Sequence, residues 1–391
     1  MALLCTFLLA LSPQSGLAST TSDSQLAVDP VCHDEAWLQL TAHAPHATVY
    51  WPRAAWFAQL RDGDGNAQLD LLPGVDALTV VMRKRAQAVT PADLAFSLDT
   101  SYLQFEDGDL LRFDPRGGLE CILPEATLVS VFAISSGNFD LDAAHLAGDL
   151  LFFSVKDGLH SDWLGAIEDG DLLYYRHDDG TAGRIWTEAQ VQTMVDQARP
   201  GAGAIGDLKS ITADPSTEEL CFTVQAPTAH DSSLYGESGG GRVVPGFEEA
   251  DYGFQSSTEI DAFTFLPTHF EPGPVLDLDL PYAASGETVR LKLRHGTPGG
   301  IARGIITRRR GFAESDRGGV SAIFLDQSDP LYQRQLQRGW MHPTPIDSGG
   351  SASFLWTAPV LPPQFSHVDH FFQAVDAASG SLSNPVLVRL R

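Results

Sequence analysis

Residues 62–70 carry oxygen-bearing side chains at alternate positions, a pattern typical of calcium loops. Read as an EF-hand loop, the segment has Ala67 at the position of the glycine turn and Pro73 where the bidentate glutamate belongs. It therefore predicts either an acidic turn that binds no ion or weak calcium binding, at roughly 10⁻⁴ to 10⁻³ M. Calcium is the only cofactor that the sequence suggests. The candidate ligands are Asp62, Asp64, Asn66 and Asp70.

A serine among glycines is the second feature with a chemical reading. Residues 236–240 fit the Gly-x-Ser-x-Gly pattern, in which Ser238 would be the nucleophile. Such a serine needs a base and an orienting acid close by, and it normally lies on a turn from a strand into a helix. The segment has instead the composition of a flexible glycine loop. We therefore expect no serine-hydrolase activity and no labelling by a fluorophosphonate probe.

The other nucleophiles and bases form no recognisable catalytic set. Pairs of carboxylates arise by chance in so acidic a chain and carry little evidence for glycosidase chemistry. The cysteines follow no zinc spacing, and after loss of Cys5 their odd number allows at most one internal bridge. Cys121 and Cys221 are predicted in apolar strands, either as buried thiols or as a disulfide. The histidines are scattered, at positions that include His43, His46, His160, His177, His230, His367 and His370.

A repeated phrase indicates the elements that would position any site. A Phe-Ser strand followed by Glu-Asp-Gly-Asp-Leu-Leu occurs over residues 96–111 and again over residues 153–173. A third copy starts at Phe222, so the copies begin 57 and then 69 residues apart, the size of a four-stranded unit. Asp-Gly favours a hairpin turn because glycine accepts a positive φ. The phrase therefore predicts a strand, a turn and a further strand in each unit.

A first strand and an outer strand complete each predicted unit. Apolar stretches at residues 119–132 and 183–195 predict the outer strands. Units of this kind bury their faces only against one another, which favours closure into a small β-propeller of about four blades over residues 46–268. The first strands, each with an acidic residue and apolar alternation, are predicted at residues 75–81, 140–144, 207–211 and 259–265.

The fourth unit begins at residue 259 but lacks its outer strands. Residues 46–60 are strand-like and have no other partner, so we predict that they complete the unit begun by residues 260–265. This closure would remove exposed sheet edges.

Residues 269–391 have the pattern of a second β-domain. Apolar and polar residues alternate at residues 275–280 and 288–293, as in half-buried strands. Further strand-like segments, separated by turns rich in Gly, Pro and Ser, predict an antiparallel β-sandwich. The predicted fold class is therefore all-β.

The strand and turn patterns of residues 75–267 resemble the repeats of predicted secreted bacterial proteins of unknown function. Residues 273–391 resemble the β-sandwich module that often closes such proteins. The two parts cover about four fifths of the chain. The resemblance implies this fold and export, and it implies no activity. The third repeat departs from the pattern, with three glycines at 239–241 where the acidic turn would stand.

The N-terminus has the features of a signal peptide over residues 1–18. A short, mostly apolar run at residues 2–11 is followed by small and polar residues that suit cleavage after Ala18. The alternative is an N-terminal core strand. No later segment approaches the roughly 20 apolar residues of a membrane helix. We therefore expect a secreted, periplasmic or cell-surface protein, in which residues 19–45 form an N-terminal segment ahead of the repeats.

Charge is unevenly distributed along the chain. Residues 270–391 carry 12 Lys and Arg against 11 Asp and Glu, whereas the preceding residues carry 13 against 39. So acidic a first part argues against nucleic acid or an anionic membrane as partner. The sequence therefore predicts an exported, non-enzymatic structural or binding protein with a protein or glycan ligand. The alternative is a secreted hydrolase with its site at the mouth of the propeller, where loops converge.

Overall fold

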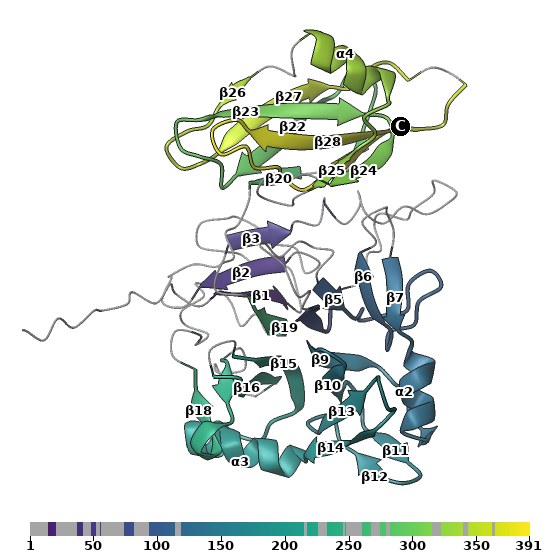
Figure 1. The fold of residues 1–391 in the computed structure, drawn as a ribbon, viewed down its shortest axis with the longest axis vertical. Helices are drawn as coiled ribbons and strands as arrows, with labels where there is room; N and C mark the ends of the chain where they lie inside the picture. Colours follow the sequence, from purple (N-terminus) through teal and green to yellow (C-terminus); the bar gives the residue numbers. More distant parts are fainter. Residues whose placement is uncertain are drawn as a thin grey trace, which may run out of the picture.

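The computed structural model of the protein describes most of the chain. In this part the protein consists mainly of β-strands in antiparallel sheets, which confirms the predicted β class, with a few short helices (Figure 1). The described residues are 15–20, 37–41, 48–51, 55, 74–81, 94–113, 119–214, 217–225, 233–244, 247, 260–266, 274–278, 282–314, 322–338, 343–361 and 364–391.

Four four-stranded antiparallel sheets make up the N-terminal part. Sheet 1 contains β4 (Leu78–Val80), β5 (Leu94–Phe96), β6 (Leu110–Phe113) and β7 (Leu119–Leu123). Sheet 2 contains β9 (Leu141–Ala147), β10 (Leu150–Val155), β13 (Leu172–Arg176) and β14 (Ala182–Trp186). Sheet 3 contains β15 (Asp207–Ala213), β16 (Leu220–Gln225), β17 (Tyr235–Gly236) and β18 (Arg242–Val243). Sheet 4 contains β19 (Ile260–Phe265), β1 (Ser15–Thr20), β2 (Trp37–Thr41) and β3 (Thr48–Trp51).

The first strands of the four sheets lie next to one another. β4 packs against β9 and β19, and β15 packs against β9 and β19. A small additional sheet beside sheet 2 contains β8 (Ile134–Ser136), β11 (Leu159–Ser161) and β12 (Gly165–Ile167). The first strands therefore form the centre of this part of the molecule, and the later strands of each sheet lie farther out.

The phenylalanine of each repeat occupies the same place in its sheet. Phe96 pairs with Leu111, and Phe153 pairs with Leu173, so each stands opposite the last leucine of the Gly-Asp-Leu-Leu phrase. All three repeat phenylalanines, including Phe222, are fully buried. The repeat in the sequence is therefore also a structural repeat, in which a phenylalanine ring is buried within each sheet.

The serine after each phenylalanine links one sheet to the next. The Ser97 hydroxyl donates to the carbonyl of Leu141 on β9 at 2.8 Å, and the Ser154 hydroxyl donates to the carbonyl of Leu208 on β15 at 2.8 Å. Both serines are buried. Because a buried carbonyl without a partner costs about 1–3 kcal/mol, these bonds favour a fixed placement of neighbouring sheets.

The last aspartate of Glu-Asp-Gly-Asp joins the turn to a helix. Asp171 accepts the N–H of Glu168 in its own turn at 3.1 Å and the N–H of the first residue of α3 (Glu188–Ala198) at 2.8 Å. Asp109 makes the equivalent two bonds at the start of α2 (Glu125–Val131). The predicted hairpin turn is therefore wrong for the second copy, which joins β12 (Gly165–Ile167) to β13 of a different sheet, and neither Gly108 nor Gly170 has a positive φ. The motif instead caps the helix that follows the sheet.

The glycine of this motif is required by the close approach of the helix. A Cβ atom on Gly108 would lie 2.6 Å from Cγ of Glu125 and 2.8 Å from the backbone oxygen of Phe139. We expect Gly108→Ala to lower the free energy of unfolding by roughly 1–3 kcal/mol through overpacking. The matched control is Gly158→Ala, whose Cβ would come no nearer than 3.6 Å to another atom. Urea denaturation of both variants checks this, and equal effects would contradict it.

The predicted outer strands at residues 119–132 and 183–195 are each half strand and half helix. They contain β7 followed by α2 and β14 followed by α3. At α3 the reason is a capping box, in which the Thr187 hydroxyl accepts the N–H of Gln190 and the Gln190 side chain accepts the N–H of Thr187; α2 begins instead after Pro124, which has no capping side chain. The sequence Thr-Glu-Ala-Gln at residues 187–190 is the usual signature of a helix start. The apolar content of residues 183–195 alone wrongly predicted a strand throughout.

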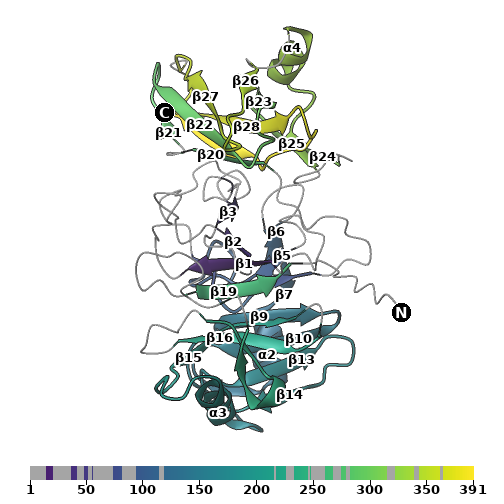
Figure 2. The same cartoon turned by 90° about the vertical axis from the view of Figure 1, so that its left-hand side faces the viewer.

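Sheet 4 joins the two ends of the N-terminal part. β3 lies in the same sheet as β19, as predicted for residues 46–60, but at the far edge. The strand that pairs with β19 is β1, which also pairs with β2, and both views place β1 beside β19 (Figure 2). The cleavage point predicted after Ala18 lies inside β1. Cleavage there would remove Ser15–Ala18, all of which pair with β2.

The C-terminal part contains two main sheets that share one core. Sheet 5 contains β20 (Val275–Leu278), β22 (Thr288–Arg294) and β27 (Ala352–Thr357). Sheet 6 contains β21 (Tyr282–Ala283), β29 (Val386–Leu390), β28 (Val368–Asp376), β23 (Ile301–Thr307) and β26 (Thr344–Pro345), with β21 and β29 parallel. Leu291 and Phe354 of sheet 5 pack in one cluster with Ile306, Phe372 and Val388 of sheet 6. A hairpin of β24 (Arg310–Glu314) and β25 (Ala322–Leu325) and helix α4 (Pro330–Arg338) complete this part.

The two parts share apolar contacts. Val375 and Leu382, from the C-terminal part, belong to the same buried cluster as Phe96 and Phe113 of sheet 1 and Ala262 of sheet 4. The boundary predicted between residues 268 and 269 is therefore bridged by a small shared core.

Candidate functional site

Charged residues recur at one register position of the central strands. The residues that pair with the repeat phenylalanines are Leu78, Ala144 and Ile211. Two positions before them stand Asp76, Asp142 and Lys209. Because the central strands pack against one another, these side chains converge from three sheets.

Sheet 4 carries an aspartate at the equivalent position. The Thr79 hydroxyl accepts the N–H of Leu146, and the Thr212 hydroxyl accepts the N–H of Phe265. Phe265 is therefore equivalent to Leu146, and Asp261 to Asp142. The equivalent position in the four central strands is therefore occupied by Asp76, Asp142, Lys209 and Asp261. Three of the four are aspartates, and sheet 3 has a lysine instead.

Two lysines bridge the aspartates at the centre. Nζ of Lys209 lies 3.2 Å from Oδ1 of Asp142 and 3.1 Å from Oδ2 of Asp207. Nζ of Lys156 lies 2.9 Å from Oδ2 of Asp76 and 3.6 Å from Oδ2 of Asp140. No aspartate of this group is more than 5% exposed. We call Asp76, Asp140, Asp142, Asp207, Lys156 and Lys209 the central cluster.

Burial dominates the electrostatics of the central cluster. Desolvation raises the pKa of Asp140 to about 7, with the Asp76 charge adding to the effect. Desolvation and then the Asp207 charge raise the pKa of Asp142 well above its usual value. Burial lowers the pKa of Lys156, but the carboxylates of Asp76 and Asp140 outweigh this and raise it overall. Burial therefore favours the protonated form of Asp140 and Asp142, which reduces the negative charge that the two lysines face.

The sequence predicts an acidic residue in each first strand but does not indicate its role. The available signal was its recurrence at a fixed distance from the Phe-Ser strand. The constant spacing indicates that these acidic residues occupy equivalent positions in the first strands. Lys156 follows β10, and its proximity to Asp76 and Asp140 is seen only in the structure.

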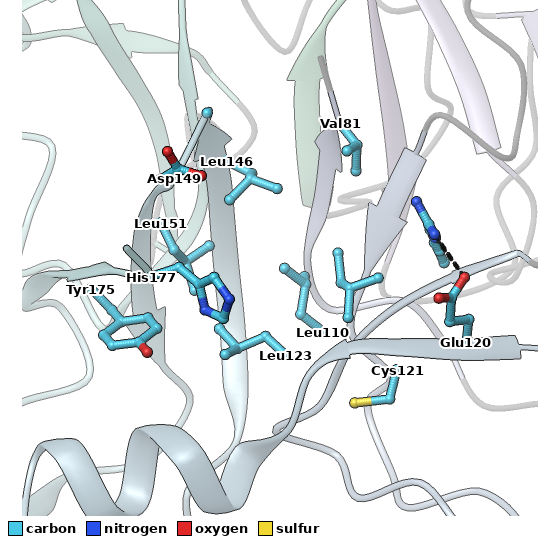
Figure 3. A pocket seen from close by; sticks show the side chains of 13 residues that line it. Val81, Leu110, Glu120, Cys121, Leu123, Leu146, Asp149, Leu151, Tyr175 and His177 are labelled. Atoms are coloured by element: carbon cyan, nitrogen blue, oxygen red, sulfur yellow. Dashed lines mark hydrogen bonds and ion pairs between the residues drawn. The ribbon is translucent and has the colours of Figure 1, made fainter. Parts of the chain in front are cut away.

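A groove lies between sheets 1 and 2 (Figure 3). It has a volume of about 360 Å³. Figure 3 shows one wall made by the β9–β10 hairpin and β13, and the other made by β6 and β7. Its apolar lining is Val81, Leu110, Ile122, Leu123, Leu146 and Leu151.

Polar groups lie around this apolar lining. Arg112 and Glu120 form an ion pair at 2.8 Å on the side of sheet 1. On the side of sheet 2, Asp149 is exposed, and its backbone carbonyl accepts the N–H of His177 at 2.8 Å. The ring of His177 lies edge-on to Tyr175. The groove therefore combines an apolar surface with an acidic group on its rim.

The thiol of Cys121, which lines the groove, is not activated as a nucleophile. Burial, followed by the nearby charge of Asp109, raises the pKa of Cys121 to about 11. The thiol is therefore protonated at neutral pH, and a protonated thiol is a poor nucleophile. Cys121 and Cys221 are both free thiols, so the predicted alternative of a bridge between them is wrong.

Ser238 lies in a tight turn that a carboxylate stabilises. It begins the short helix η2 (Ser238–Gly240), and its N–H donates to Oε1 of Glu219 at 2.7 Å. The Ser238 hydroxyl also bonds to Glu219, which Arg242 holds at 2.7 Å. In the part of the chain that the structure describes, no histidine hydrogen-bonds to Ser238. Glu219 takes the capping role that Asp109 and Asp171 have in the other repeats.

The structure does not gather the histidines into one site. His160 lies on β11, His177 lines the groove, and His370 is buried on β28 of the C-terminal part. The candidate calcium ligands Asp62, Asp64, Asn66 and Asp70 lie outside the described residues, as do His43, His46 and His230.

Three carboxylates meet where the first acidic turn touches α2. Oxygens of Glu106, Asp107 and Glu125 lie within 4.8 Å of one another. Burial and then the Asp107 charge raise the pKa of Glu125. Glu188 of α3 has the same relation to Asp169, and its pKa is raised for the same two reasons. The crowding follows from the capped turn and recurs in both repeats, so it reflects the repeat architecture.

No helix in the described ranges is long and apolar enough to cross a membrane. No family model matches the sequence, and no curated protein matches it significantly. The N-terminal domain of the Streptococcus gordonii adhesin Sgo0707 aligns over 97% of this chain and 90% of its own, at 10% identity and a TM-score of 0.19. The native form of Escherichia coli alpha-2-macroglobulin aligns over 98% of this chain and 38% of its own, at 11% identity and a TM-score of 0.21. Likeness at this level carries no argument about fold or function.

Proposed function

We propose that the protein is an exported binding protein of the cell surface or periplasm. In this proposal sheets 1 to 4 are the blades of a four-bladed β-propeller, and sheets 5 and 6 form a β-sandwich. Four antiparallel sheets of equal strand number, with first strands packed at the centre and a last sheet built from both ends, support the propeller. The apolar N-terminal run supports export.

The groove between sheets 1 and 2 carries the binding proposal. Its volume of about 360 Å³ lies within the usual range for ligand pockets. The residues before 270 carry 13 basic against 39 acidic side chains, and Asp149 adds a carboxylate at the rim. Charge complementarity therefore favours a basic partner. The ligand that fits is a basic peptide segment that inserts one aliphatic side chain.

A protein ligand suits the groove better than a glycan. Sugar rings stack on exposed aromatic faces, which offer apolar contact beside hydrogen-bonding groups. Tyr175 is the aromatic residue of the lining, and it is only 5% exposed. Aliphatic side chains make up most of the rest, so an aliphatic group finds the larger contact area.

A binding role is also favoured over the alternative of a hydrolase. Catalytic sites bring perturbed carboxyls into an accessible cleft. Here the carboxyls with the largest pKa increases lie buried in the central cluster, where lysines hold them. The groove contains instead a salt-bridged glutamate and a protonated thiol.

Calorimetry with short peptides tests the proposal. Acetyl-Lys-Lys-Leu-Lys-Lys-amide is expected to bind one to one. It should bind roughly tenfold or more tighter than the version with Ser for Leu, because burying a leucine contributes about 1.5–3 kcal/mol, and more tightly than the version with Glu for Lys, because like charges oppose binding to an acidic surface. Leu146→Lys should abolish this binding. The matched control is Leu355→Lys, on an exposed leucine of β27. Absence of binding, or equal binding by the Leu146→Lys protein, would refute the proposal.

A further inference from the structure

We propose that Asp142 and Asp207 share one proton in the folded chain, and that this proton makes the contact between sheets 2 and 3 sensitive to pH. Asp142 lies on β9, the first strand of sheet 2, and Asp207 begins β15, the first strand of sheet 3. The two carboxyl side chains hydrogen-bond to each other. Two ionised carboxylates have no hydrogen to donate, so this bond requires a proton on one of them.

The surroundings of the pair supply one positive charge for two carboxyls. Nζ of Lys209 lies 3.2 Å from Oδ1 of Asp142 and 3.1 Å from Oδ2 of Asp207. Among the described residues, no donor from a third side chain or from the backbone reaches the other oxygen of either aspartate. Asp142 is fully buried and Asp207 is 5% exposed, so ionising both would bury a second negative charge, which is strongly unfavourable. One proton leaves the three side chains neutral.

The neighbouring strands do not supply a second cation to the pair. Besides Lys209, the charged groups around it are the carboxyls of Asp76, Asp140 and Asp169 and the ammonium of Lys156. Lys156 forms its own ion pairs with Asp76 and Asp140, at 2.9 Å and 3.6 Å. On β19 of sheet 4, the position equivalent to Asp142 is again an aspartate, Asp261. The surrounding charges therefore favour retention of the proton.

The shared proton gives stability a definite dependence on pH. Burial and then the Asp207 charge raise the pKa of Asp142 well above its ordinary value of 3.8. When the pH rises above that value, the unfolded chain loses the proton while the folded chain keeps it, which favours unfolding. The stabilisation is therefore complete below about pH 4 and is lost as the pH rises through the pKa of the folded chain. One retained proton changes the folding equilibrium constant by up to about tenfold per pH unit.

Urea denaturation at intervals from about pH 5 to about pH 8 tests the inference. Asp142→Asn replaces the shared proton by an amide that can donate to Asp207 at every pH. We expect the folding equilibrium constant of this variant, relative to wild type, to rise roughly tenfold or more across this range. The matched control is Asp178→Asn, on an exposed aspartate in the turn between β13 and β14, and its ratio to wild type should stay constant. A ratio for Asp142→Asn that does not rise with pH would overturn the inference.

Infrared spectroscopy of the wild-type chain makes the test independent of whether the variant folds. Burial raises the pKa of Asp140 to about 7, so this neighbour is mostly ionised at about pH 8. At that pH the folded chain should still show the carbonyl band of a protonated carboxyl, and the band should disappear when heat unfolds the chain. A folded chain without this band would refute the shared proton. Both measurements are made without peptide, so their outcome is independent of the binding proposal.

Discussion

Deletion of residues 1–20 is expected to unfold sheets 1 to 4 together, whereas deletion of residues 1–14 leaves their thermal transition unchanged. β1 lies between β19 and β2, so its loss leaves β19 without its antiparallel partner and separates β2 and β3 from the sheet. Because β19 packs against both β4 and β15, the damage spreads to sheets 1 and 3. Thermal unfolding followed by circular dichroism measures the effect.

The C-terminal part provides the internal control for this deletion. Its main core lies between sheets 5 and 6, so we expect its transition to remain in the shortened chain. Two deletions with the same thermal transition would contradict the role of β1. The result also bears on export, because a leader cut after Ala18 would remove most of the strand. A chain that keeps sheet 4 complete must retain Ser15–Thr20.

Lys209→Met is the substitution with the largest expected effect on stability. Nζ of Lys209 lies within 3.2 Å of oxygens of both Asp142 and Asp207. Removing one partner of a buried ion pair typically costs about 3–5 kcal/mol because the other charge stays buried without compensation. We therefore expect the free energy of unfolding in urea to fall by about that amount.

Arg176→Met is the matched control for this substitution. Arg176 is an exposed cation on β13 of sheet 2, and exposed substitutions usually change stability by less than about 0.5 kcal/mol. A loss of less than about 1 kcal/mol for Lys209→Met would show that the central charges are compensated in another way.

Local patterns predicted the repeating elements because they depend on neighbours in the chain. The Phe-Ser strands follow from the apolar pattern and are found where the sequence places them. The Glu-Asp-Gly-Asp segments are turns, but their role of capping the next helix depends on contacts with residues 16 and 17 positions later. The helix at Glu188–Ala198 was missed because its apolar content was read without the capping box at Thr187. The apolar content and the capping box together predict a helix at these residues.

The assignment of residues 15–20 shows a real ambiguity of sequence. Small and apolar residues suit both the end of a signal peptide and a β-strand. Pairing with β19, which lies more than two hundred residues later, decides between them in the structure, and no local signal reports that partner.

The two candidate sites depend on contacts between sheets. Asp142 and Lys209 are 67 residues apart, and the walls of the groove come from two different repeats. Sequence reasoning identified the acidic residues of the first strands, but their distances follow from how the sheets pack. The serine bonds between sheets, such as Ser154 to Leu208, are part of that packing.

Hydrogen exchange with the Lys-Lys-Leu-Lys-Lys peptide bound tests most directly whether the groove is the binding site. We expect slower exchange in β7, Leu119–Leu123, and across the hairpin of β9 and β10 around Gly148, because these segments form the two walls. We expect no change in sheets 5 and 6. Protection confined to the C-terminal part, or exchange in both walls that the peptide leaves unchanged, would contradict it.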